Sequence, residues 1–209
     1  MKFRGAPFIY LLIIPVVLGC VFMGLLLLGA FKEKHSIFDN PSAESRCKYA
    51  AVDSTPLSSG TAYDIATRLF TKRDNNEALL VCAIHSYSLD LVGSMSYHDS
   101  GSSASVFVIW ISDRVLKRAP PKILEFALAH EHGHHALYFD LCGDADDDKY
   151  VACEHRIDAY AANVVGIDEG IKALVFFNRL LLAEGDRARD VRLVTRRIDL
   201  MYQEMLHKQ

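Results

Sequence analysis

The pattern of hydrophobic and polar positions divides the chain into two parts. Residues 8–31 are largely apolar and contain no charged side chain, whereas charged and apolar residues are interspersed throughout the rest of the sequence. A helix of about 20 apolar residues is long enough to cross the hydrocarbon layer of a membrane. We therefore predict a flank at 1–7 that stays in the cytoplasm and a transmembrane anchor at 8–31 that contacts the lipid bilayer.

Two other readings of this N-terminal run fit less well. A signal peptide has an apolar core of about 7 to 15 residues followed by a small-residue cleavage site, and no such site closes this run. Lipidation of Cys20 remains an alternative, although residues 21–31 stay apolar where a lipoprotein would become polar. Lys2 and Arg4 favour a cytoplasmic amino terminus. We expect a single-pass membrane protein whose domain is extracytoplasmic.

Beyond the anchor, the spacing of apolar residues predicts three helices. Residues 32–60 are rich in Ser, Pro and Asp without a sustained period, which indicates a linker. Residues 61–70 have the 3,4 spacing of a short amphipathic helix. A longer helix begins at Pro120-Pro121 and covers 121–139, and an alanine-rich helix covers 150–166 and ends at a glycine.

Two short apolar runs are typical of buried strands, at 78–84 and 106–111. Residues 93–105 are rich in Gly and Ser and predict a loop. Together these elements predict one domain at 61–209, an α+β fold that is mostly helical with a small sheet.

The helix at 121–139 carries an HExxH motif, His130-Glu131-His132-Gly133-His134. His130 and His134 lie one helical turn apart on the same face, which is the spacing of two imidazole ligands on one tetrahedral zinc ion. Glu131 lies beside them and can take a proton from a water molecule that the metal activates. His132 and His135 point away from this face and are more typical of packing or surface histidines.

A third metal ligand is offered by the next helix. Glu154 and Asp158 fall four residues apart on one helical face. A His2Glu set with an open position is the catalytic form of a zinc site, so we predict one Zn²⁺ per chain, held by His130, His134 and Glu154. Asp158 could accept a hydrogen bond from a ligand imidazole. The alternative is an acidic pair on a solvated helix face.

The order HExxH followed by Glu154-x-x-x-Asp158 resembles the membrane-associated gluzincin zinc metallopeptidases, which include HtpX, the yeast-type CAAX prenyl proteases and the envelope proteases BepA and LoiP. The similarity covers roughly residues 60–205. It implies a minigluzincin-like domain that cleaves peptide bonds. In this family an edge strand before the HExxH helix holds the substrate backbone, so the resemblance implies that 106–112 forms that edge and that Val106, Val108 and Trp110 contact the substrate.

The resemblance also extends to Arg197-Ile198, which matches the end of a family motif and implies that Arg197 contacts the oxyanion or the substrate. At the start of that motif, Asp190-Val191 stands where the family has His-Pro. Ser103-Ala104 is the nearest equivalent of an Asn-Ala pair that the family has on its edge strand. The resemblance therefore leaves the auxiliary donor to the transition state unassigned.

Charge and composition exclude several other functions. The chain has 23 basic and 26 acidic side chains and a formal net charge of −3. No basic stripe with interleaved aromatic residues is present, so nucleic acid is not an expected partner. The acidic residues at 144–148 lack the glycine and glutamate of a calcium-binding loop and indicate a solvated turn.

Four cysteines follow the anchor: Cys47, Cys82, Cys142 and Cys153. They contain no CxxC pair, so a structural zinc site built from thiolates is not supported. In an oxidising compartment they could form two disulfides with three possible pairings, and in a reducing cytosol they would be small buried hydrophobic residues. If the domain is extracytoplasmic, Cys142 and Cys153 are the best-placed pair because they bracket the loop between the two ligand-bearing helices, which leaves Cys47 for Cys82.

These observations predict a membrane-anchored zinc metalloendopeptidase that acts on a protein or peptide substrate. A catalytically inactive, membrane-tethered protein of the same fold that binds or scaffolds a partner is the main alternative. A cytosolic regulatory metallopeptidase is a third. The presence of Glu131 favours the enzyme, because a purely structural metal site does not need a base.

Overall fold

The computed structural model describes residues 42–50, 53–70, 78–85, 91–98, 105–137, 142, 146–183, 185 and 188–207. The predicted flank at 1–7 and the predicted anchor at 8–31 lie outside these residues. Within the described ranges, no helix combines the length and the apolar character needed to cross a membrane. The described residues belong to one compact unit that begins at Ser42.

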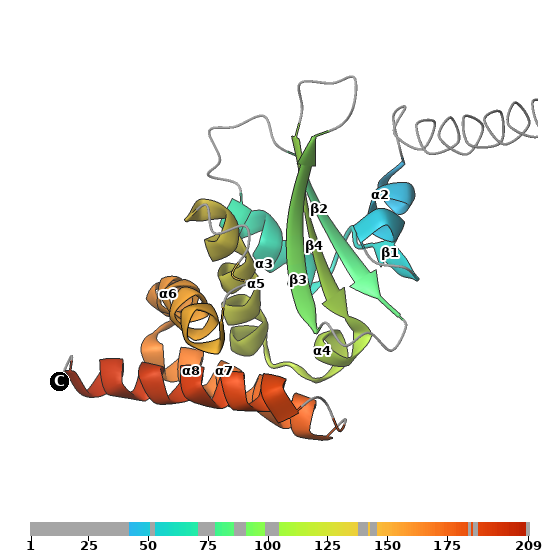
Figure 1. The fold of residues 1–209 in the computed structure, drawn as a ribbon. Coiled ribbons are helices and arrows are strands. Elements are labelled where there is room, and N and C mark those ends of the chain that lie inside the picture. The colour runs from blue at the N-terminus through green and yellow to red at the C-terminus, as the bar shows by residue number, and fades with distance from the viewer. Residues whose placement is uncertain are drawn as a thin grey trace, which may run out of the picture. The chain divides into compact units, whose positions relative to one another are not determined.

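A mixed sheet of four strands forms the centre of this unit (Figure 1). The strand order is β1-β2-β4-β3, in which β2 and β4 are parallel and the two outer strands are antiparallel to their neighbours. The bounds are β1 Ser54–Pro56, β2 Ala78–Ile84, β3 Val92–His98 and β4 Ser105–Ser112.

Helices cover the sheet and extend beyond it. Helices α3 and α5 lie on one face of the sheet and α2 lies on the other, while α6, α7 and α8 pack beyond α5 (Figure 1). The bounds are α2 Ala43–Ala50, α3 Thr61–Phe70, α4 Asp113–Arg118, α5 Pro121–Ala136, α6 Asp147–Val165, α7 Ile167–Ala183 and α8 Ala188–His207. The predicted class, α+β and mostly helical with a small sheet, is confirmed.

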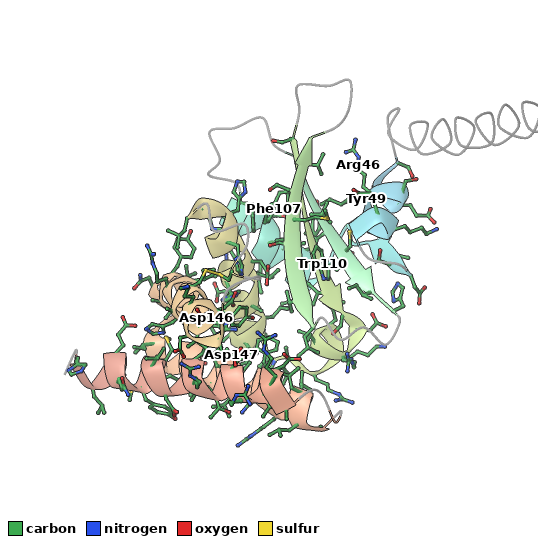
Figure 2. The ribbon with its side chains drawn as sticks, viewed as in Figure 1. Arg46, Tyr49, Phe107, Trp110, Asp146 and Asp147 are labelled. Atoms are coloured by element: carbon green, nitrogen blue, oxygen red, sulfur yellow. A yellow bond between two sulfur atoms is a disulfide. The ribbon has the colours of Figure 1, made fainter. Side chains whose placement is uncertain are left out.

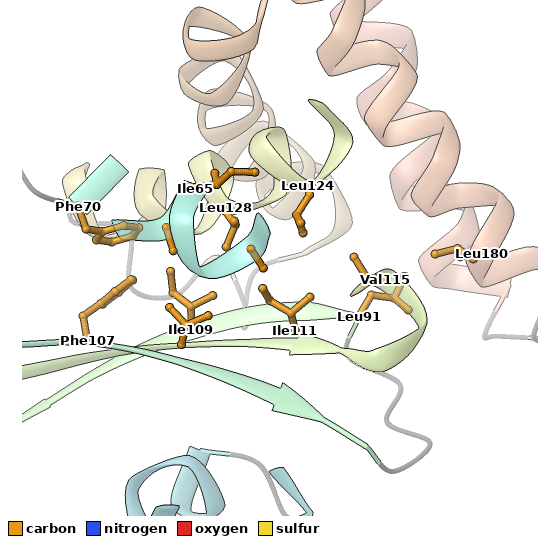
Figure 3. Close-up of a cluster of buried hydrophobic side chains, with 13 residues drawn as sticks. Ile65, Phe70, Leu91, Phe107, Ile109, Ile111, Val115, Leu124, Leu128 and Leu180 are labelled. Carbon is orange, nitrogen blue, oxygen red and sulfur yellow. The ribbon is translucent and has the colours of Figure 1, made fainter. Parts of the chain in front are cut away.

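The main core lies between the sheet and the helices α3 and α5. Phe107, Ile109 and Ile111 alternate along β4 and are buried against Leu124 and Leu128 of α5 (Figure 3). Because successive side chains of a strand point to opposite faces, Val106, Val108 and Trp110 face the other side of the sheet. There they pack around Cys47 and Cys82.

The structure corrects the predicted cleft edge. Strand β4 lies inside the sheet, between β2 and β3, so 106–112 is not an edge strand. Val106 and Val108 are buried, and Trp110 packs with them on the face away from α5, so none of the three is placed to contact a substrate near the HExxH helix. The apolar run at 106–111 is continuous because both faces of β4 are buried.

The predicted loop at 93–105 is also wrong in its first half, because 92–98 forms β3, the outer strand beside β4. Its small and polar residues hid the strand pattern. Gly93 is required here by close packing, since a Cβ would lie 2.5 Å from the indole of Trp110. Ser94 and Ser96 pair with Ile109 and Phe107, and therefore face the side of the sheet that carries α5.

The predicted linker at 32–60 contains folded structure from residue 43 onward. Residues 43–56 include α2 and β1, and β1 pairs with β2. Cys47 of α2 is fully buried and forms a disulfide with Cys82 of β2. The domain therefore begins before residue 61, because a covalent bridge and a strand pairing hold this segment where its polar composition would not.

Both disulfides follow the pairing that we predicted for an extracytoplasmic domain, Cys47 with Cys82 and Cys142 with Cys153 (yellow bonds in Figure 2). The second bridge joins the segment after α5 to the middle of α6. It closes a loop with a sequence separation of 11. In the folded domain the bridge ties α6 to the segment that follows α5. It also restricts the unfolded chain, which stabilises the folded state.

Removal of this second bridge is expected to lower stability. The double variant Cys142→Ser with Cys153→Ser should lose about 2 to 3 kcal/mol of unfolding free energy, because the unfolded chain gains the freedom of the opened loop. Chemical denaturation of the two proteins measures the difference. An unchanged midpoint and slope would show that the bridge contributes nothing to stability.

Candidate metal centre

The candidate site lies where α5 and α6 pack against each other. Helix α5 is buried around much of its surface, because the sheet and α3 cover one side while α6 and α7 cover the other. Gly133 within the HExxH motif permits a close approach of α6, since a Cβ there would lie 2.9 Å from Ile157 and 3.0 Å from Tyr160. This packing brings the acidic face of α6 to the histidines of α5.

The three predicted ligand residues lie together. His130 Nε2 is 3.2 Å from one carboxylate oxygen of Glu154, and His134 Nε2 is 3.7 Å from the other. One ligand atom from each residue lies within 4.8 Å of the other two. Ligands at typical zinc distances on a tetrahedron are separated by about 3.4 Å, so the donor set and its spacing fit a metal ion. The cluster could therefore bind a metal.

Asp158 contacts the first histidine of the cluster, where the sequence offered it as a hydrogen-bond acceptor. Its Oδ1 is 3.0 Å from His130 Nδ1, and the Asp158 side chain is fully buried. When Nδ1–H of His130 donates to this carboxylate, Nε2 carries the lone pair, and that lone pair points toward Glu154 and His134. This is the tautomer that a metal-binding histidine requires.

Arg197 of α8 joins the two carboxylates of α6. Its Nε and Nη2 donate to Asp158 at 2.8 and 2.7 Å, and its Nη1 is 3.1 Å from Glu154 Oε2. The resemblance implied that Arg197 contacts the oxyanion or the substrate. The structure directs each of its three guanidinium nitrogens to a carboxylate, so Arg197 holds Glu154 and Asp158 in place.

The charges of this cluster shift its proton equilibria. Burial lowers the pKa of His130, but the carboxylates of Asp158 and Glu154 outweigh burial and raise it to about 10. Burial raises the pKa of Glu154, but Arg197 and the histidines lower it to about 2. Arg197 likewise holds the pKa of Asp158 below its ordinary value despite burial. The carboxylates are therefore ionised at neutral pH, and a metal that binds must displace a proton from His130.

Glu131 is close to the cluster and is not one of its ligands. Its carboxylate accepts a hydrogen bond of 2.7 Å from Ser94 Oγ on β3. Glu131 and His130 line a cavity of about 430 Å³ whose other walls are mainly apolar side chains of α5, α7 and α8. A carboxylate that lines a cavity beside a cluster able to bind a metal is placed to accept a proton.

Comparisons of the chain with protein-family models, curated proteins and solved structures found no match. The assignment of the site therefore depends on its own geometry.

The other histidines have different partners, as predicted for residues off the ligand face. His132 Nδ1 is 2.8 Å from the Tyr160 hydroxyl, and His135 Nδ1 is 3.3 Å from Ser96 Oγ. Both side chains therefore have partners outside the candidate metal cluster.

The acidic residues at the N-terminal end of α6 cap the helix and pair with α8. Asp146 caps α6 by accepting from the backbone N–H of Lys149, and Asp147 accepts from Arg189 and Arg192 of α8 (Figure 2). Asp148 accepts from Arg196. These pairs link the start of α6 to α8, the helix that carries Arg197.

Sequence reasoning missed two contributors to the site. Ser94 lies in the segment that we predicted as a loop, and only the alternation of serines at 94 and 96 could have indicated a strand face. Tyr150 lines the cavity and lies four residues before Glu154, so the same spacing that revealed Asp158 could have revealed it.

Asp158→Asn is expected to weaken metal binding by about 10- to 100-fold, because the amide orients and polarises the imidazole of His130 less well than a carboxylate. Competition with a chelator measures the affinity. Asp168→Asn is a matched control, since Asp168 is exposed at the start of α7. An affinity equal to that of the unmodified protein would remove Asp158 from the support of the site.

Proposed function

We propose that the protein is a zinc-dependent metalloendopeptidase of the minigluzincin type. The observation that carries this proposal is the cluster of His130, His134 and Glu154 beside a separate carboxylate, Glu131, which lines a cavity together with His130. A closed structural site would have a fourth protein ligand, and among the described residues the cluster has three.

A zinc ion in this cluster would supply Lewis acidity, which lowers the pKa of water to about 7 and polarises a peptide carbonyl. Glu131 accepts the proton of the attacking water and then delivers it to the leaving nitrogen as the C–N bond breaks. Ser94 holds the Glu131 carboxylate by its hydrogen bond. Asp158 and Arg197 keep His130 and Glu154 in the orientation that the metal requires.

The substrate backbone is proposed to pair with β3. Among the described strands, β3 pairs only with β4, so its outer edge offers N–H and C=O groups to an extended peptide. Ser94 on this strand contacts Glu131, which places the edge beside the base. The resemblance implied that 106–112 pairs with the substrate backbone. We assign that pairing to 92–98, the next strand outward.

We also propose that the domain works outside the cytosol. Two disulfides join its segments, and such bonds form and persist in oxidising compartments. This agrees with the orientation expected from Lys2 and Arg4, although the anchor itself lies outside the described residues.

The test is metal analysis and cleavage of casein or a peptide library by the purified full-length chain. We expect one zinc per chain and endoproteolytic cleavage that a chelator stops and added Zn²⁺ restores. Bound zinc without any cleavage would favour the alternative, an inactive protein of the same fold that binds a partner. A protein that binds no zinc and cleaves nothing would contradict the zinc peptidase and leave only the inactive binding protein.

A further inference from the structure

A hydrogen-bond donor aimed at the substrate carbonyl would accelerate hydrolysis at this site. As water attacks the peptide carbonyl carbon, the π electrons of the C=O bond move onto its oxygen, and negative charge develops there. Donors aimed at that oxygen are among the largest contributions to such reactions. The candidate donors are the polar side chains that line the cavity with Glu131.

Arg197 is one such side chain, but its hydrogen bonds go elsewhere. Each of its nitrogens contacts Asp158 or Glu154 at 3.1 Å or less, and its side chain is nearly buried. Turning it toward a substrate would leave two buried carboxylates without their cation, which costs several kcal/mol. Asp190 also lines the cavity, but an ionised carboxylate accepts hydrogen bonds and donates none.

Tyr150 is the remaining donor. It lies in the first turn of α6, and Glu154 and Asp158 follow it at intervals of four residues, so all three lie on the face that α6 turns toward the site. Its side chain lines the same cavity as His130 and Glu131. Its hydroxyl makes no hydrogen bond to any residue that the structure describes.

The surroundings keep this hydroxyl protonated. Burial raises the pKa of the Tyr150 phenol above its ordinary value, and the carboxylates of Glu154 and Asp190 raise it further, against the opposing charge of Arg197. The phenol is therefore an O–H donor throughout the neutral range, and its rigid ring holds the group at the cavity.

We infer that Tyr150 is a catalytic residue whose hydroxyl donates a hydrogen bond to the carbonyl oxygen of the scissile peptide as that oxygen becomes negative. This inference rests on the proposed peptidase function. No proton is transferred from Tyr150: the proton of the attacking water passes to Glu131 and then to the leaving nitrogen, and the Tyr150 O–H bond stays intact. The hydroxyl stabilises the transition state more than the substrate, because the charge on the oxygen is largest there.

The test compares Tyr150→Phe with Tyr160→Phe in the full-length chain. Tyr160 lies on the same helix. Its hydroxyl forms a hydrogen bond with His132, which is outside the candidate metal cluster. We expect Tyr150→Phe to lower kcat by about 100-fold or more while KM, zinc content and the thermal transition stay near those of the unmodified protein. Tyr160→Phe should keep its kcat.

A second readout separates a donor to the transition state from a packing role. A phosphonamidate peptide carries a tetrahedral, negatively charged group in place of the scissile carbonyl, and we expect Tyr150→Phe to bind it more weakly by a factor close to the loss in kcat. Affinity for the cleavage products should not change. Calorimetry measures both affinities.

Equal kcat and equal phosphonamidate affinity in Tyr150→Phe and the unmodified protein would overturn the role of Tyr150 and leave the peptidase proposal intact. A parallel loss of zinc or of thermal stability would also overturn it, in favour of a structural role. An unmodified protein that binds zinc and cleaves nothing would overturn the peptidase proposal, and the role of Tyr150 with it.

Discussion

Glu131→Gln is expected to lower kcat for peptide cleavage by about 100- to 10,000-fold, the range for loss of a general base. The amide matches the carboxylate in size and can still accept the hydrogen bond from Ser94, but it cannot take a proton from water. Zinc content and the thermal transition should stay near those of the unmodified protein, because Glu131 is not among the three ligand residues.

Glu125→Gln is a matched control for this variant. Glu125 lies on the same helix, α5, and pairs with Arg68 and Lys122 away from the cavity. It should retain turnover, because Arg68 and Lys122 are exposed and the loss of an ion pair to an exposed cation costs little stability. Cleavage by Glu131→Gln at the rate of the unmodified protein would show that another group acts as the base.

His134→Ala and Glu154→Ala are each expected to reduce the zinc content from one ion per chain to none after dialysis, and to abolish cleavage. Each variant leaves two of the three protein ligands, which is too few for a stable zinc site. His134 is the cleaner position, because its side chain is 21% exposed and lies outside the buried network of Asp158 and Arg197. Elemental analysis of the dialysed proteins measures the metal.

His135→Ala is the control for loss of an imidazole. His135 is the next residue on α5, contacts Ser96 and packs against the ring of Phe107. It should keep one zinc ion. Full zinc in Glu154→Ala would remove Glu154 from the ligand set and would require a different third ligand.

The elements with strong local patterns could be predicted from the sequence. Helix α3, strand β2 and the two long helices α5 and α6 have the expected positions, because their apolar spacing reflects burial that each segment undergoes on one or more faces. The candidate ligand residues could also be predicted from the sequence, because residues four apart on a helix lie on one face whatever packs against that face.

The segments with weak local patterns depended on their partners. Strand β3 contains small and polar residues, and it is a strand because β4 supplies its hydrogen bonds and Trp110 covers Gly93. Segment 43–56 is folded because a disulfide and the pairing of β1 with β2 hold it. Local composition carries no information about either partner.

The sequence by itself determined the donor set, namely two histidines and a carboxylate on consecutive helices with Asp158 one turn beyond. Only the tertiary structure decided how these groups are used. Helix α8 brings Arg197 to the carboxylates of Glu154 and Asp158, and β3 brings Ser94 to Glu131. The Tyr150 side chain lines the cavity, and its hydroxyl has no hydrogen-bond partner among the residues that the structure describes. The reason is physical: spacing along one helix follows from its 3.6-residue period, whereas contacts between distant segments depend on how whole elements pack.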